Sequence, residues 1–128
     1  MIHGVAVTAV VHFVRYQRLL GRAGIGFWRD VIIVSVAILL ALLAHLVELV
    51  LWALVFILCG EFSHFATAVY HSAVNYTSLG YGDIVMSARW RLLGPLETAD
   101  GMLMFGISTA MIFAVIERLV RTRFKFEH

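Results

Sequence analysis

Two long apolar stretches, separated by a mixed segment, dominate the pattern of hydrophobic and polar positions along the chain. The first, residues 31–60, contains a single charged residue, Glu48. At a rise of about 1.5 Å per residue, a helix of this length reaches roughly 45 Å, which exceeds the hydrocarbon thickness of about 30 Å. Gly60 then ends the stretch. The pattern predicts a transmembrane helix over residues 30–60 that tilts or protrudes from one face of the bilayer.

The second apolar stretch, residues 101–116, falls just short of spanning length by itself. It reaches that length if its helix begins near Pro95, a favoured first-turn residue, and so includes Glu97 and Asp100. We therefore predict a second transmembrane helix over residues 95–117. Together the two stretches predict an all-α membrane protein with two spans.

The first twenty residues form a shorter pattern with one polar and one apolar face. Residues 2–14 carry no formal charge but are too few to span a bilayer. On a helix the polar stripe consists of Thr8, His12, Arg15, Arg18 and Arg22, and the opposite stripe of Val7, Val10, Val11 and Val14. This pattern predicts an amphipathic helix over residues 1–27 that lies in the cytoplasmic interface. A short third span is the alternative that the sequence leaves open.

The distribution of cations predicts which side of the membrane each segment faces. Before the first span come Arg15, Arg18, Arg22 and Arg29, and after the second come Arg118, Arg121, Arg123 and Lys125. The segment between the spans holds only Arg89 and Arg91. By the positive-inside rule, and if the N-terminal helix is interfacial, both termini are cytoplasmic in a multi-pass protein of the cell (inner) membrane. Residues 118–128 are then a short basic cytoplasmic tail, with membrane lipids as expected partners.

Composition supports a membrane protein and excludes several other classes. The chain is 62% hydrophobic and only 14% charged, against about 25% charge in a typical soluble domain. A formal net charge of +2 is too small to indicate a nucleic-acid partner. The single cysteine, Cys59, excludes an internal disulfide and a cysteine-rich metal site.

The segment between the two spans is not patterned like a loop. Ser63 is suited to cap a helix over residues 63–77, which is too short to cross the bilayer. The stretch Thr-Ser-Leu-Gly-Tyr-Gly-Asp follows at residues 77–83. Non-helical backbone at membrane depth occurs only where it is buried in protein or lines a watery cavity. The sequence therefore predicts a re-entrant pore loop.

This arrangement resembles the pore module of the two-transmembrane-helix potassium channel family, pore-loop cation channels of the small bacterial type. The family's filter reads Thr-Thr-Val-Gly-Tyr-Gly-Asp, against Thr-Ser-Leu-Gly-Tyr-Gly-Asp at residues 77–83 here. The phrases His-Leu-Val-Glu at 45–48 and Trp-Arg-Leu-Leu-Gly at 90–94 are also similar to small bacterial members. The resemblance implies a pore domain over residues 28–117, a homotetramer, and K⁺ as the permeant ion.

The resemblance also implies which residues form the selectivity filter. These are Thr77, Ser78, Leu79, Gly80, Tyr81 and Gly82. Carbonyl oxygens of Ser78, Leu79, Gly80 and Tyr81 would coordinate K⁺, and the Ser78 hydroxyl would form the innermost ring. The mechanism suits these residue types, because turning successive carbonyls toward one axis needs conformations that cost little only for glycine. Four chains are required, since a single strand cannot encircle an ion.

Several positions depart from the family pattern. Ser78 replaces a threonine and Leu79 a valine, and the supporting residues Tyr70, His71 and Val74 also differ from common family members. Because His71 replaces a tryptophan that bonds to the filter aspartate, we predict a contact between His71 and Asp83. These departures leave a less selective cation pore as an alternative to a potassium-selective channel.

The polar and small residues within the predicted spans each allow a structural and a functional interpretation. His45 and Glu48 share a helix face, so they predict a bonded cluster against the pore helix, with structural or gating and proton-sensing roles both open. Gly101 and Gly106 are candidates either for a gating hinge or for close helix contact. Glu97 and Asp100, near the outer mouth, would either attract cations or pair with the arginines at 89 and 91.

Three classes of function remain to be compared. The leading prediction is a potassium-conducting pore, and the second is a non-conducting regulatory or structural membrane subunit with the same fold. An enzyme is not expected, because only the pair His45 and Glu48 approaches a catalytic arrangement, without a nucleophile or a third partner.

Overall fold

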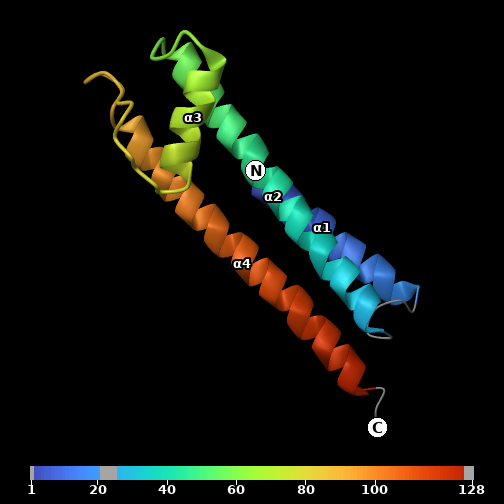
Figure 1. The fold of residues 1–128 in the computed structure, drawn as a ribbon. Helices are drawn as coiled ribbons and strands as arrows, with labels where there is room; N and C mark the ends of the chain where they lie inside the picture. The colour runs from blue at the N-terminus through green and yellow to red at the C-terminus, as the bar shows by residue number, and fades with distance from the viewer. Residues whose placement is uncertain (1, 21–25, 126–128) are drawn as a thin grey trace. The chain divides into compact units, whose positions relative to one another are not determined.

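A computed structural model describes residues 2–20 and 26–125 of the chain. Four helices account for most of them: α1 (Ile2–Leu19), α2 (Phe27–Leu58), α3 (Phe65–Tyr76) and α4 (Leu93–Lys125) (Figure 1). Within these residues there is no β-strand, which confirms the all-α fold. Arg22 of the predicted basic stripe and residues 126–128 of the predicted tail lie outside the described part.

The two predicted transmembrane helices correspond to α2 and α4. The most apolar 18 residues have a mean hydropathy of 2.6 within Phe27–Leu58 and of 1.8 within Leu93–Thr122, and both helices are long and apolar enough to cross a bilayer. α4 is longer than predicted, because it continues through the basic segment to Lys125. An i,i+4 ion pair between Glu117 and Arg121, 2.6 Å long, supports this extra helix.

The contacts of the chain divide it into two units, with the divisions inside α2 and α4. The first unit consists of residues 1–44 and 107–128, and the second of residues 45–106. The first thus contains α1 with the first half of α2 and the second half of α4. The second contains α3, the connecting segments and the other halves of α2 and α4.

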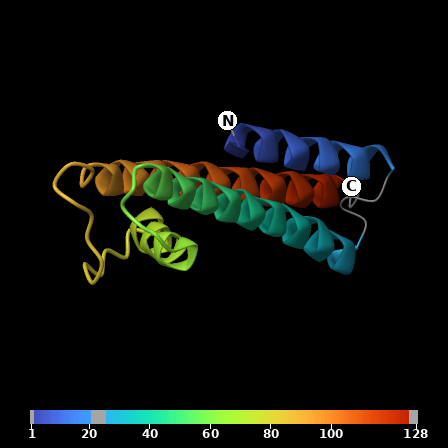
Figure 2. The ribbon, with the colours of Figure 1, turned by 90° about the horizontal axis from the view of Figure 1, so that it is seen from above.

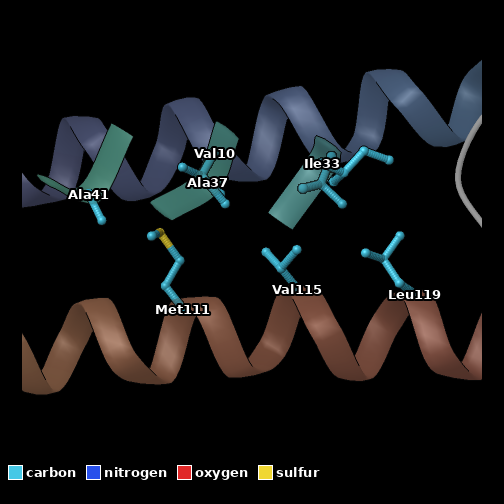
Figure 3. Close-up of a cluster of buried hydrophobic side chains, with 8 residues drawn as sticks. Val10, Ile33, Ala37, Ala41, Met111, Val115 and Leu119 are labelled. Atoms are coloured by element: carbon cyan, nitrogen blue, oxygen red, sulfur yellow. The ribbon is translucent and has the colours of Figure 1, made fainter. Parts of the chain in front are cut away.

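The core of the first unit forms where three stripes of apolar side chains meet (Figure 3). α1 contributes Val10 and Val14, α2 contributes Ile33, Ala37 and Ala41, and α4 contributes Met111, Val115 and Leu119. On α2 and α4 these residues recur every fourth position, which places them on one face of each helix. The alanines allow close approach of the helices, as is common in membranes.

The valine face predicted for the N-terminal helix is the face by which α1 packs. Val10 is completely buried and Val14 is 2% exposed. Nearer its start, His3 Nε2 forms a buried 2.9 Å hydrogen bond with Ser108 Oγ of α4. α1 therefore runs alongside the second half of α4, beginning beside Ser108 (Figure 2).

The second unit holds α3 between the end of α2 and the start of α4 (Figure 1). Its buried side chains are Ala68, His71, Ser72, Val74 and Tyr76. The predicted cap at Ser63 is wrong: the N-cap is His64, without a side-chain hydrogen bond, and the helix begins at Phe65. The twelve residues of α3 span about 18 Å, too little to cross a bilayer.

Candidate functional site: the Thr77–Asp83 segment and its supports

The candidate filter begins where α3 ends in a Schellman cap. The Leu79 amide donates to the Val74 carbonyl over 2.9 Å, and the Ser78 amide donates to the Asn75 carbonyl over 2.8 Å. This pair of hydrogen bonds requires a left-handed backbone at the residue that follows the C-cap, and Ser78 at that position has φ of +58°. Glycine usually fills that position, so a serine there is strained by roughly 1–2 kcal/mol. The cap turns the chain sharply out of the helix.

The left-handed conformation then recurs at every second residue. Gly80 has φ of +58° and Gly82 has φ of +70°, whereas Leu79 and Tyr81 between them do not have positive φ. The alternation matches the predicted demand for glycine at these two positions. In an ordinary extended strand, by contrast, successive carbonyls point to opposite sides of the chain.

Every residue of the candidate filter is exposed in the single chain. Leu79 is 55% exposed and Tyr81 is 66% exposed. Thr77 and Ser78 use their hydroxyl hydrogens locally: Thr77 Oγ1 donates to the Ala73 carbonyl and Ser78 Oγ to the Thr77 carbonyl, over 2.7 and 2.6 Å. Exposed apolar and aromatic side chains around a strained backbone leave a surface that another molecule can cover.

Asp83, at the outer end of the segment, is held by Tyr70 of α3. The Tyr70 hydroxyl donates a 2.7 Å hydrogen bond to Asp83 Oδ2. This bond lowers the pKa of the Asp83 carboxyl and raises the pKa of the Tyr70 hydroxyl. The predicted contact between His71 and Asp83 takes the form of an electrostatic interaction, and the hydrogen bond to the carboxylate comes from the neighbouring tyrosine instead.

Besides its electrostatic interaction with Asp83, His71 contacts Asn75 and two aromatic rings. Its Nε2 lies 2.8 Å from Asn75 Nδ2, one helical turn further along α3. The rings of Phe56 and Phe62 lie 5.3 and 5.0 Å from the imidazole. Burial, as the largest cause, lowers the pKa of His71, so the neutral ring is favoured.

Val74, the other predicted support, acts through its backbone as well as its side chain. Its side chain is buried, and its carbonyl accepts from both Leu79 and Gly80, the latter over 3.2 Å. A neighbouring carbonyl, that of Asn75, also accepts a 2.9 Å bond from Thr98 Oγ1 of α4. The last turn of α3 is thus tied both to the filter segment and to α4.

The predicted cluster of His45 and Glu48 is built around a residue that the sequence analysis missed. The Tyr76 hydroxyl donates to Glu48 Oε2 over 2.6 Å and lies 2.9 Å from His45 Nδ1. The ring of Phe105 stacks on His45 with centroids 4.4 Å apart. Tyr76 is 1% exposed and ends α3, so the cluster packs against α3, the helix for which the pore-helix role was predicted. The sequence signal that could have identified Tyr76 is its position directly before the candidate filter, where a tyrosine hydroxyl can reach the polar face formed by His45 and Glu48.

A second missed contact joins α3 to both long helices. The Ser72 hydroxyl lies 2.8 Å from the Leu49 carbonyl of α2 and also contacts Oε1 of Glu97 of α4. Glu97 is completely buried, and its Oε2 has no hydrogen-bond partner among the described residues. Asp100 accepts a 3.0 Å bond from Trp52 Nε1. Both predicted alternatives for Glu97, at the outer mouth or paired with an arginine, are therefore wrong, because the helix turns it inward toward α3.

Glu61, in the turn after α2, forms hydrogen bonds with the segment that follows the candidate filter. Its two carboxylate oxygens accept bonds from Ser87, one from the amide at 2.7 Å and one from the hydroxyl at 2.6 Å. These bonds lower the pKa of Glu61. The turn after α2 is thereby linked to the segment that leads from the filter to α4.

The two glycines predicted as hinges differ in their surroundings. A Cβ on Gly101 would collide with the Tyr76 carbonyl, whereas nothing lies within 4 Å of a Cβ on Gly106. The close-contact reading therefore applies to Gly101. Gly106 has open space on that side and keeps its predicted role as a hinge candidate.

Comparison with known proteins adds one result. The model of a two-transmembrane ion channel family, described simply as ion channel, matches residues 36–118. That match begins in α2, includes α3 and the whole candidate filter, and ends in α4. No curated protein and no solved structure matches the chain significantly.

Proposed function

The chain belongs to this two-transmembrane ion channel family, and on that premise we propose that it is one subunit of a homotetrameric, potassium-selective channel. In the proposed mechanism, K⁺ exchanges its water shell for carbonyl oxygens of Ser78, Leu79, Gly80 and Tyr81. The Ser78 hydroxyl adds the innermost ring of oxygens. The channel would lie in the cell (inner) membrane, with both termini in the cytoplasm if α1 lies in the interface rather than spanning the bilayer.

The observation that carries the proposal is the backbone at the end of α3. Left-handed residues alternate at positions 78, 80 and 82, directly after a helix too short to cross the bilayer. Such alternation supports successive carbonyls that share one side of the chain. Neutral carbonyls suit an alkali cation, because they replace water oxygens without trapping the ion by a full charge.

The direction of α3 supports the same function electrostatically. Its C-terminal end, at Tyr76, meets the candidate filter. A helix C-terminus carries a partial negative charge equivalent to about half an elementary charge, which favours a nearby cation. No charged side chain lies between Thr77 and Gly82, so this partial charge and the carbonyls are the local determinants.

A fourfold assembly follows from the proposed coordination. One chain supplies one strand, and an ion needs oxygen ligands on all sides. The exposure of Leu79 and Tyr81, at 55% and 66%, supports a surface that neighbouring copies cover. Association with identical copies is the commonest form of assembly for such a surface.

Reversal potentials in opposed potassium and sodium gradients test this proposal. We expect purified protein in planar bilayers to reverse near the potassium equilibrium potential. Equal permeability to potassium and sodium would replace the proposed selective channel with a less selective cation pore. The departure that favours this alternative is Ser78, which lacks the methyl group of the family's threonine. Absence of current at all voltages and pH values would instead support a non-conducting regulatory or structural subunit.

A further inference from the structure

His71, near the middle of α3, forms hydrogen bonds toward both ends of the candidate filter. Its Nε2 lies 2.8 Å from Nδ2 of Asn75, which comes two residues before the filter begins at Thr77. Its ring also donates a hydrogen bond to the backbone carbonyl of Ile84, the residue directly after Asp83. The imidazole therefore joins the segment that enters the filter to the segment that leaves it.

The bond between His71 and Asn75 requires a neutral imidazole. An amide nitrogen carries two hydrogens and has no lone pair to offer, so it can only donate, and Nε2 of the ring must accept. The ring proton therefore lies on Nδ1, from which it is donated to the Ile84 carbonyl. The rings of Phe56 and Phe62 cover the imidazole, and this burial lowers the pKa of His71, which favours the neutral form.

Asn75 in turn holds the chain at the point where it enters the filter. Its carbonyl accepts a 2.8 Å hydrogen bond from the amide of Ser78, the residue with the left-handed backbone, and a 2.9 Å bond from Thr98 Oγ1 of α4. Its side-chain amide packs on Gly94 of α4, where a Cβ would lie 3.4 Å from Nδ2. Asn75 is thus fixed at its backbone and at its side chain. Of these contacts, the bond to His71 is the one that a proton can break directly.

Two carboxylates oppose the effect of burial on the imidazole. Glu61, in the turn after α2, and Asp83, at the outer end of the filter, both interact electrostatically with His71 and favour its protonated form. Both carboxylates reach the surface. From α4, the carboxyl of Glu97 interacts with the Asn75 amide. Because burial and the two carboxylates act in opposite directions, a change in pH can select between the two forms of the ring.

We propose that Asn75 is a positioning residue of the filter and that protonation of His71 from the outer side releases it. Once Nε2 carries a proton, the ring and the Asn75 amide are both donors, so their bond breaks and the amide must turn. The last turn of α3 then loses its connection to the segment after the filter, and Ser78 is held less firmly. Acid should therefore reduce potassium current at a higher pH than protonation of Asp83, because the pKa of that carboxyl is lowered. The effect on ions rests on the proposed function, whereas the proton-dependent bond does not.

Nuclear magnetic resonance of the full-length protein with isotope-labelled histidine follows this bond without any ion flux. The signal of His71 is identified by its loss in His71→Gln. We expect the imidazole to be neutral, with its proton on Nδ1, at about pH 8, and to take up a second proton below pH 6.5, the ordinary histidine pKa. The backbone amide signal of Ser78 should shift over the same pH range. In Asn75→Asp the protonated ring gains a carboxylate partner, so its titration should move above pH 6.5.

Potassium current as a function of outer pH, between about pH 5 and 8, connects the bond to the filter. In the unaltered protein the current should fall with the midpoint of the imidazole titration. His71→Gln can accept from Asn75 through its side-chain oxygen, as the neutral ring does, so it should keep the current and lose the pH dependence. Asn75→Leu removes the bond without adding charge, so it should reduce the current about fivefold already at high pH, the factor for one hydrogen bond of about 1 kcal/mol. His64→Gln, an exposed histidine directly before α3, is the control and should keep the unaltered profile.

Several results would overturn the proposal. An unchanged pH dependence in His71→Gln, or full current in Asn75→Leu at high pH, would show that Asn75 does not position the filter. An imidazole that is protonated at about pH 8, or that titrates alike in Asn75→Asp and the unaltered protein, would exclude the bond itself. If Asn75→Leu does not fold, the pH dependence of His71→Gln and the Ser78 amide shift still decide the question. A protein without current in which the imidazole and the Ser78 amide titrate together would refute the proposed conduction alone.

Discussion

Gly101 of α4 lies directly against the main-chain carbonyl of Tyr76, the last residue of α3. A Cβ built on Gly101 would be well under 3.0 Å from that oxygen and 3.0 Å from its carbonyl carbon. The contact is with backbone, which cannot rotate away as a side chain can. Glycine at this position therefore sets how closely α4 approaches the end of the helix that precedes the candidate filter.

We predict that Gly101→Ala displaces the end of α3 and damages the filter. The methyl group must push α4 and Tyr76 apart, and overpacking of this kind costs about 1–3 kcal/mol. The expected result is a lower midpoint of thermal unfolding in detergent, together with a reduced ratio of potassium to sodium permeability. Both are measured on purified protein, the second from reversal potentials.

Gly106→Ala is the matched control on the same helix. Nothing lies within 4 Å of its Cβ position, and alanine favours a helix interior by about 1 kcal/mol over glycine. We expect unchanged selectivity and equal or higher stability. Loss of function in Gly106→Ala with normal Gly101→Ala would contradict this assignment and would favour a hinge at Gly106.

Gly80 tests the role of the left-handed backbone in the filter. With φ of +58°, it can be replaced by alanine only at a cost of roughly 1–2 kcal/mol per chain. We predict that Gly80→Ala relaxes toward negative φ, turns a carbonyl out of line and abolishes potassium selectivity. Potassium-dependent flux into liposomes and reversal potentials measure the effect.

Gly60 provides a control with the same strain in another place. It follows α2, has φ of +76°, and has nothing within 4 Å of a Cβ position. Gly60→Ala should therefore lower stability by a similar amount but leave selectivity intact. Equal loss of selectivity in both variants would show that strain alone, rather than carbonyl direction in the filter, causes the defect.

The hydrogen bond from Tyr70 to Asp83 predicts how the filter responds to acid. The Asp83 pKa in the folded chain is lower than its ordinary value of 3.8, chiefly because Tyr70 donates to the carboxylate. The bond therefore contributes fully above pH 3.8 and is lost as the pH falls through the lower folded pKa. In Tyr70→Phe the folded pKa moves back up toward 3.8, so acid loss of the filter should begin at a higher pH.

The measurement is potassium current as a function of pH on the outer side, between about pH 2 and 5, a window that includes the ordinary Asp pKa of about 3.9 and the lower values. Tyr16→Phe serves as the control, because Tyr16 is an exposed tyrosine of α1, 59% accessible, far along the chain from the filter. Its acid profile should equal that of the unaltered protein. Identical profiles for Tyr70→Phe and the unaltered protein would mean that the bond does not hold Asp83 in the conducting state.

Much of the fold was predictable because it depends on long, uniform patterns. The single charge in residues 31–60 was sufficient to predict α2, and the glycines at 80 and 82 were sufficient to predict unusual backbone there. Helix ends were predicted less well. Nothing in the pattern shows that His64 rather than Ser63 precedes α3, since no side chain caps it.

The partners of individual polar groups could not be predicted from spacing along the chain. Tyr70 and His71 are adjacent on α3, so their side chains point in directions about 100° apart around the helix axis. The rotation of α3 about that axis therefore decides which of the two bonds to Asp83, and in the structure it is Tyr70. Tyr76 was likewise missed, because its role depends on three helices meeting at one hydroxyl. Sequence periodicity gives a helix face but not the rotation at which that face meets its neighbours.

Glu97 and Ser72 offer the sharpest test of those inward contacts. The Ser72 hydroxyl has one hydrogen but lies beside two acceptors, the Leu49 carbonyl and Oε1 of Glu97. If the hydrogen goes to Leu49, Glu97 must itself be protonated and donate to Ser72. A neutral acid also avoids the large cost of an isolated charge in a fully buried position.

We predict that Glu97→Gln is tolerated, with unfolding free energy within about 1 kcal/mol of the unaltered protein, because its amide can donate to Ser72 in place of the acid. Ser72→Ala leaves a buried carboxyl without its partner and should cost about 1–3 kcal/mol. Denaturant unfolding of both variants in the same detergent gives the comparison. If Glu97 were ionised, the order would reverse: glutamine would lose a charge-assisted bond and be the more damaging change.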